Sequence, residues 1–224
     1  MIFCSIIILT EKRQGKYSIF YPNGQLKESG NMKNGLVDGL ILNYFESGGL
    51  KYERMFKQDK KNGITKTYYE SGELEQTGSY LNSKEEGNWK AFYKNGQLLF
   101  DVNYTNGELN GPGKEFYENG NLQAEFVKKN GYTHGPVKKY YENGQLQSEE
   151  NTNMGVIIGT TKTYYSNGQI QEIQNRSNDG KLNGEFLSYY DNGKPKSKGS
   201  YTDDTKSGKW FEWNEKGKKQ VIKY

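Results

Sequence analysis

Residues 140–146 read Tyr140-Tyr-Glu-Asn-Gly-Gln-Leu146, and variants of this stretch recur along the whole chain. Each variant holds a polar turn that ends in glycine, preceded in all but the last copy by a pair of aromatic residues and followed in most copies by an aliphatic residue two positions later. The turn glycines stand 24 residues apart, with a single step of 25, and they are Gly24, Gly48, Gly72, Gly96, Gly120, Gly144, Gly168, Gly193 and Gly217. Self-similarity at a fixed period of this length is typical of a repeat architecture.

A second series of glycines keeps the same step, nine positions ahead of the first. Its members are Gly15, Gly39, Gly63, Gly87, Gly111, Gly135, Gly159, Gly184 and Gly208. Asn-Gly between β-prone segments is a strong hairpin signal, because a type I′ turn needs positive φ at both of its central residues. The sequence therefore predicts an all-β fold: an elongated, single-layer, twisted antiparallel sheet of about nine stacked β-hairpins. Residues 15–217 would form the nine 24-residue hairpin repeats, and residues 218–224 a C-terminal cap.

The strand register follows by counting if Asn-Gly supplies a two-residue turn at the ring pair. Tyr69 would then face Leu74, and Gly63 would lie opposite Tyr80, whose ring can cover the bare glycine backbone. The same count places lysines opposite acids in the pairs Lys90–Asp101, Lys114–Glu125 and Lys138–Glu149. Such cross-strand pairs each contribute roughly 0.2–1 kcal/mol.

The two rings of each pair must point to opposite faces of the sheet, because side chains alternate along a strand. We name the face with the second-series glycines the glycine face and expect it to be the packed side. The other face, the lysine face, carries the first ring of each pair and a row of lysines, and rows of aromatic side chains make a contact surface of low conformational entropy. The alternative is structural, with lysines paired to acids and rings packed on one another. The predicted collective binding surface comprises Tyr44, Tyr68, Phe92, Phe116, Tyr140, Tyr164, Lys66, Lys90, Lys114, Lys138 and Lys162.

Four segments carry a family resemblance: residues 140–146, Tyr68-Tyr-Glu-Ser-Gly-Glu-Leu74, Phe116-Tyr-Glu-Asn-Gly-Asn-Leu122 and the linking Lys33-Asn-Gly-Leu-Val-Asp-Gly39. They resemble the MORN repeat, in the bacterial variant found in YwqK-type antitoxin proteins. The resemblance covers about residues 15–217. It implies stacked hairpins without catalytic activity, used for protein contacts, self-association or membrane attachment. The antitoxin variant implies a protein that binds and neutralises a partner toxin.

Composition argues against several classes of site. The 224 residues include one cysteine, Cys4, and one histidine, His134, so a disulfide framework and a multi-Cys or His-rich metal centre are excluded. A formal net charge of +4 is far from the concentrated basic excess of most nucleic-acid-binding proteins. We expect no cofactor, no metal and no nucleic acid, with His134 as a polar turn residue and Cys4 as a small buried residue or, alternatively, a lipidated one.

Two functions of different classes remain open. The first is a non-catalytic scaffold for protein–protein interaction, with neutralisation of a toxin as its specific form. The alternative is a surface-exposed ligand-binding module for cell wall, choline or lipid headgroups, since related ring-rich repeats build cation cages. Membrane contact through the lysines is disfavoured, because acids oppose many of them. Exposed strand edges at the sheet ends favour a homodimer. The apolar run within residues 1–14 is either a cap strand or the remnant of an export signal, which leaves cytoplasm versus export open.

Overall fold

The computed structural model describes residues 13–224, and these residues form strands and turns with no helix. The expectations for Cys4 and for a cap strand or signal in residues 1–12 lie outside the described residues. Every strand pair is antiparallel, which confirms the all-β hairpin fold. The part of the chain that is described therefore contains no helix long and apolar enough to cross a membrane. The chain divides into two compact units, residues 1–86 and residues 87–224.

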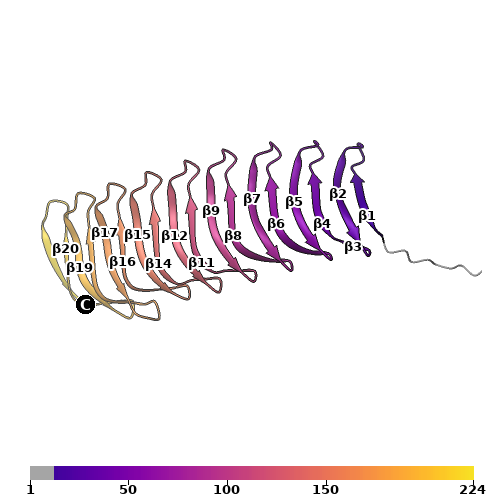
Figure 1. Ribbon diagram of the computed structural model, residues 1–224. Coiled ribbons are helices and arrows are strands. Elements are labelled where there is room, and N and C mark those ends of the chain that lie inside the picture. The colour runs from indigo at the N-terminus through magenta and orange to yellow at the C-terminus, as the bar shows by residue number, and fades with distance from the viewer. Residues whose placement is uncertain (1–12) are drawn as a thin grey trace, which may run out of the picture. The chain divides into compact units, whose positions relative to one another are not determined.

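Unit 1 contains seven complete strands that pair in chain order (Figure 1). The short strand β3 continues the line of β4 beside β2. The strands are β1 (Gly15–Phe20), β2 (Leu26–Lys33), β3 (Leu36–Val37), β4 (Gly39–Tyr44), β5 (Leu50–Lys57), β6 (Lys60–Tyr68) and β7 (Leu74–Leu81). The next strand, β8 (Lys84–Phe92), begins in unit 1 and ends in unit 2.

Unit 2 repeats the same arrangement, and within it the hairpins follow one another in a single row (Figure 1). After β8 its strands are β9 (Leu98–Thr105), β10 (Glu108–Leu109), β11 (Gly111–Phe116), β12 (Leu122–Lys129), β13 (Tyr132–Thr133), β14 (Gly135–Tyr140), β15 (Leu146–Asn153), β16 (Val156–Tyr164), β17 (Ile170–Arg176), β18 (Leu182–Tyr189), β19 (Pro195–Thr202), β20 (Thr205–Trp213) and β21 (Lys219–Lys223). The last of these covers most of the segment expected to form a C-terminal cap, and it pairs with β20.

The turn beside each ring pair differs from the expected two-residue turn. In the hairpin of β14 and β15, the Gly144 N–H donates to the Tyr141 carbonyl at 2.8 Å, and the Tyr141 N–H donates to the Gln145 carbonyl at 2.8 Å. Gly144 has φ 84°, whereas the preceding asparagine keeps negative φ. This is a three-residue loop, a type I turn followed by a left-handed glycine. Tyr140, rather than Tyr141, consequently pairs with Leu146.

The two-residue turn lies at the opposite end of the hairpins, where the sequence indicated a looser connection. Asn34 and Gly35 have φ 55° and 81°, and Asn106-Gly107 and Asn130-Gly131 repeat this geometry. Gln58 and Asp59 adopt it without a glycine, at φ 50° and 63°. The Asp59 carboxylate accepts the Val37 N–H at 2.6 Å, a contact that helps to hold this strained turn in place.

The register of the strand bodies is as the sequence predicts. Thr67 pairs with Gln76 but Tyr68 with Leu74, so a bulge follows the three-residue loop and cancels its extra residue, except in the hairpin of β20 and β21. The predicted pairing of Tyr69 with Leu74 is therefore wrong. The remaining predicted neighbours lie directly opposite one another, in the pairs Gly63–Tyr80, Gly87–Tyr104, Lys90–Asp101, Lys114–Glu125 and Lys138–Glu149.

The buried side chains lie on the glycine face, as expected. By strand alternation this face holds the buried residues other than glycine, which are Ile41, Thr65, Trp89, Ala91, Val102, Ala124, Val137, Ser148, Thr152, Thr161 and Trp210. Six of them, Ile41, Thr65, Trp89, Val137, Thr161 and Trp210, stand two residues after a second-series glycine and form a column that sequence reasoning missed. The core of each unit is therefore one side of a sheet.

In this one-sided core, large rings pack beside glycines of neighbouring strands. Gly113 pairs directly with Phe126, and a Cβ on Gly113 would overlap the phenylalanine ring. Gly199 pairs with Phe186, and a Cβ there would overlap the ring of Trp210. Trp210 is 1% exposed, and its ring centroid lies 5.5 Å from that of Phe186. A large ring thus occupies the space that a neighbouring glycine leaves empty.

We predict that Gly199→Ala destabilises the protein by about 1–3 kcal/mol, because the new methyl group forces Trp210 from its buried position. The shift in the urea unfolding midpoint, followed by tryptophan fluorescence, measures the effect. Gly49→Ala is the control, since its methyl group would meet nothing closer than 3.6 Å. Equal midpoints for the two variants would contradict the packing argument.

Candidate functional site

The residues of the predicted binding surface share the lysine face within each unit. Strand alternation places Tyr44, Lys66 and Tyr68 on this face of unit 1. The other eight, Phe92, Phe116, Tyr140, Tyr164, Lys90, Lys114, Lys138 and Lys162, lie on this face of unit 2. All six rings are half-buried, so each offers part of its area to a partner and packs with the rest.

Three of the five lysines are engaged by acids, as the structural alternative expects. Lys90 Nζ lies 3.4 Å from Asp101 Oδ2, its predicted partner. Lys162 Nζ lies 3.0 Å from Glu149 Oε1. Lys138, predicted to contact Glu149, instead reaches Glu125 of the preceding hairpin at 3.8 Å. The side chains of these three lysines are 41–46% exposed, and ion pairs this exposed contribute at most about 1 kcal/mol each.

Tyrosine hydroxyls of the ring row complete this network. The Tyr140 hydroxyl donates to Glu125 at 2.9 Å, and the Tyr164 hydroxyl donates to Glu149 at 2.9 Å. In unit 1 the Tyr68 hydroxyl donates to Glu53 in the same way. Each of these carboxylates thus binds a hydroxyl from the next hairpin, and Glu125 and Glu149 bind its lysine as well. Of the three predicted lysine–acid pairs only Lys90–Asp101 forms an ion pair, and the sequence-based register missed both the contacts between hairpins and the hydroxyls.

The electrostatics of the network follow from burial and hydrogen bonding. Two effects raise the pKa of Tyr68 and of Tyr140 to about 12: burial is the larger, and the hydrogen bond to a carboxylate is the second. The hydrogen bond from Lys162 and, to a smaller extent, the hydrogen bond from Tyr164 lower the pKa of Glu149. The hydrogen bond to Glu149 in turn raises the pKa of Lys162. At neutral pH this part of the lysine face is a compensated array of charges rather than a cationic stripe.

In most pairs the second ring is a tyrosine that links successive repeats, whereas Phe45 has no hydroxyl. The tyrosine hydroxyl donates to the backbone carbonyl of the first aromatic residue in the next repeat, and for Tyr117 the acceptor is the Tyr140 carbonyl, at 2.8 Å. The turn asparagine adds a parallel contact, for Asn95 Nδ2 donates to the Glu118 carbonyl at 2.9 Å. The same hydroxyl contact is made by Tyr21, Tyr93, Tyr141, Tyr165 and Tyr190. These tyrosines therefore have a structural role.

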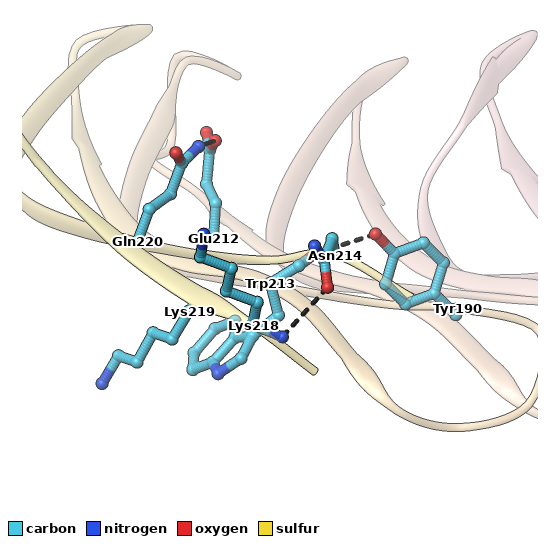
Figure 2. Close-up of a pocket in the computed structure, with 7 residues that line it drawn as sticks. All are labelled: Tyr190, Glu212, Trp213, Asn214, Lys218, Lys219 and Gln220. Carbon is cyan, nitrogen blue, oxygen red and sulfur yellow. Dashed lines mark hydrogen bonds between the residues drawn. The ribbon is translucent and has the colours of Figure 1, made fainter. Parts of the chain in front are cut away.

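A hollow of about 370 Å³ lies beside β20 and β21 (Figure 2). Its polar groups bind one another: the Tyr190 hydroxyl donates to the Trp213 carbonyl at 2.8 Å, and Gln220 Nε2 donates to Glu212 at 2.8 Å. Lys219 Nζ lies 4.0 Å from the ring centroid of Phe211. The chain's own lysine thus already occupies this cation–π position, and the same is true of Trp210, with Lys206 Nζ 4.1 Å from its centroid.

His134 lies in the irregular step between β13 and β14. Its backbone N–H donates to the Val127 carbonyl at 2.9 Å, the same contact that Asp38 and Asn110 make in their repeats. Its Nδ1 is buried without a hydrogen-bond partner in the described structure. Across residues 13–224 there is no group of three or more His, Cys, Asp or Glu residues that could hold a metal ion.

Comparison with known proteins identifies the repeat. A family model described as the MORN repeat variant matches residues 13–34, 37–58, 61–82, 85–106, 109–127, 133–153, 158–178 and 182–203, well over half of the chain. No curated protein matches. The crystal structure of TcdB2-TccC3-Cdc42 is similar at 15% identity over 92% of this chain, with a TM-score of 0.18, and the match spans 13% of that chain's length. The Photorhabdus luminescens Tc holotoxin pore is similar at 14% identity over 93% of this chain and 13% of that chain, with a TM-score of 0.18.

We predict that Tyr117→Phe lowers stability by about 1 kcal/mol, because the Tyr140 carbonyl loses its hydroxyl donor. The change is read as a shift in the urea midpoint. Tyr132→Phe serves as the control, since the Tyr132 ring is 58% exposed. A loss as large in the control as in Tyr117→Phe would refute a linking role for the hydroxyl.

We predict that Tyr140 titrates near pH 12 and that Glu125→Gln lowers its pKa towards the ordinary 10.0. Because the pKa of Tyr140 is raised in the folded state, the contribution of its protonated hydroxyl to the stability of the fold is complete below pH 10 and is lost as the pH rises towards about 12. NMR titration of the Tyr140 ring carbons provides the measurement. Glu142→Gln, at the exposed turn, is the control and should leave the titration unchanged. A pKa near 10 in the unmutated protein would contradict the Tyr140–Glu125 contact.

Proposed function

The chain belongs to the MORN repeat variant family, and on this premise we propose that it is a non-catalytic repeat scaffold that binds a protein partner through the lysine face. The observation that carries the proposal is the one-sided core. Within each unit, buried residues gather on the glycine face, while rings on the lysine face remain half-buried. Partly exposed aromatic side chains on a fixed backbone are suited to protein contacts.

The distribution of polar groups also supports a scaffold over an enzyme. Catalysis needs an acid, base or nucleophile held at a shared point, with a pKa matched to the reaction. Here the perturbed groups recur from repeat to repeat in the same tyrosine–acid contacts, such as Tyr140–Glu125 and Tyr164–Glu149. Contacts that repeat in this way suit the stacking of hairpins and the solvation of their surface, rather than a single reaction centre.

The specific form of the proposal is neutralisation of a toxin partner. It rests on the resemblance of residues 68–74, 116–122 and 140–146 to the repeats of YwqK-type antitoxin proteins. A half-buried row of rings provides the kind of surface that an inhibitory complex needs, with aromatic anchors surrounded by paired charges.

Affinity capture from the source cell tests the proposal, with the full chain as bait and the recovered protein then purified and titrated by calorimetry. We expect a single partner whose affinity falls at least about tenfold when Phe92 and Phe116 are both replaced by alanine. A toxin partner would arrest growth alone, and co-expression of this chain would restore growth. A hydrolase activity abolished by His134→Ala, with no partner recovered, would overturn the proposal.

A further inference from the structure

The net charge of the chain is concentrated in one segment. Residues 181–224 contain ten lysines and six acidic residues, whereas residues 1–180 contain equal numbers of basic and acidic residues. The formal net charge of +4 therefore belongs to β18 to β21 and their loops, all within unit 2. A charge excess confined to a few strands creates a local field that attracts oppositely charged partners.

Five of these lysines share the lysine face of neighbouring strands. One row of directly paired residues crosses the strands from Lys162 and continues with Ile173, Leu187, Lys198, Phe211 and Val221. Strand alternation along β19, β20 and β21 adds four more lysines and Trp213 to the same face. We name this surface the β19–β21 patch, and it consists of Lys196, Lys198, Lys209, Lys219, Lys223, Phe211, Trp213 and Val221.

The middle of unit 2 shows how the same row is arranged elsewhere. From β8 to β16 the charges in the row alternate from strand to strand, as Lys90, Asp101, Lys114, Glu125, Lys138, Glu149 and Lys162. Beyond Lys162 the alternation ends, because apolar residues or lysine occupy the row. Hairpins therefore stack with compensated charges, and the repeat does not require the lysine excess of the β19–β21 patch.

The acids of this segment do not neutralise the patch. Among the described residues of β18 to β21, one acid lies on the lysine face: Glu185, whose Oε1 is 2.7 Å from Lys198 Nζ. Glu212 lies on the glycine face, 3.8 Å from Lys206. The other four acids lie in the connecting loops and are Asp191, Asp203, Asp204 and Glu215. All six keep their negative charges, and the segment still has four positive charges in excess.

Two lysines of the patch lie directly opposite each other. Lys209 pairs with Lys223 across β20 and β21, and both are exposed. In the part of the chain that the structure describes, neither lysine forms an ion pair with an acid. Like charges directly opposite on neighbouring strands destabilise a sheet. A carboxylate placed between the two ammonium groups would remove this repulsion and accept charge-assisted hydrogen bonds from both.

The rings of the patch favour a protein ligand over a nucleic acid or a membrane. Lys219 Nζ is 4.0 Å from the ring centroid of Phe211 and 5.4 Å from that of Trp213, so a cation of the chain itself lies over both rings. Binding of single-stranded nucleic acid uses open ring faces on which bases stack. Val221, 58% exposed, offers one small apolar contact, whereas attachment to a membrane surface needs a broader apolar face.

We propose that the β19–β21 patch binds an acidic, extended segment of a partner protein. This inference rests on the proposed scaffold function and assigns it a place and a chemistry. Lys219 and Lys223 are four residues apart on β21, about 13 Å at 3.3 Å per residue. An extended segment with Asp or Glu at every second residue presents its carboxylates on one side at matching spacing. One of its carboxylates would lie between Lys209 and Lys223, and an apolar side chain would contact Val221.

The test uses the full chain and a synthetic peptide of about ten residues that alternates glutamate with serine and carries one central leucine. A matched peptide has glutamine in place of each glutamate. The double variant K209Q/K223Q removes two charges from the patch. The control K94Q/K129Q removes two charges from other exposed positions of unit 2. Affinities are measured by calorimetry at low and high salt.

We expect the glutamate peptide to bind and the glutamine peptide not to bind. The affinity of the glutamate peptide should fall at least about fivefold for K209Q/K223Q and change less than about twofold for K94Q/K129Q. It should also fall as salt is added, because the contacts are between exposed charges. Circular dichroism checks that both variants keep their strands.

Three results would overturn the inference: no binding of the glutamate peptide, equal binding of the glutamine peptide, or an equal loss of affinity in both double variants. Tighter binding of an oligouridine or of phosphatidylglycerol vesicles, abolished by K209Q/K223Q, would also overturn it and assign the patch to nucleic acid or lipid. The protein captured from the source cell separates this inference from the scaffold function. If that protein binds K209Q/K223Q as tightly as the unmutated chain, the inference fails and the scaffold function stands; if the unmutated chain captures no protein, the scaffold function itself fails.

Discussion

The hydrogen bond from the second tyrosine of one repeat to a backbone carbonyl of the next is the contact on which the repeat order depends. A single sheet has no second layer to cover its packed face, so each hairpin needs further contacts with its neighbour. The tyrosine supplies two at once, because its ring lies beside the turn and its hydroxyl satisfies a carbonyl 23 or 24 residues away. The turn asparagine adds a third.

The sequence predicted the strands, the register of their central residues and the packed face, because glycines, rings and charges at fixed spacing each constrain the same pairing. It failed at the turns. Asn-Gly suits both a two-residue turn and the last two positions of a three-residue loop, and the bulge at Leu74 restores the register, so residues such as Gly63 and Tyr80 cannot distinguish the two. The column of Ile41, Trp89 and Trp210 was also missed, because its members share a position but not a residue type.

The residues of the predicted surface share one face within each unit, and their contacts on that face go beyond those that the sequence indicated. Lysines such as Lys138 and Lys162 lie on the expected face, but each binds an acid of the preceding hairpin that also accepts a tyrosine hydroxyl. Counting along one hairpin cannot show contacts between hairpins.

A scaffold of this design separates stability from recognition. The glycine face and the tyrosine contacts hold neighbouring repeats together, which leaves positions on the lysine face free to vary. The most direct test of this account is a nuclear Overhauser measurement on the Tyr141 ring in solution. The account predicts cross-peaks from that ring to the backbone of Tyr164 and Tyr165 in the next repeat. Cross-peaks confined to its own hairpin, or to a hairpin two repeats away, would contradict it.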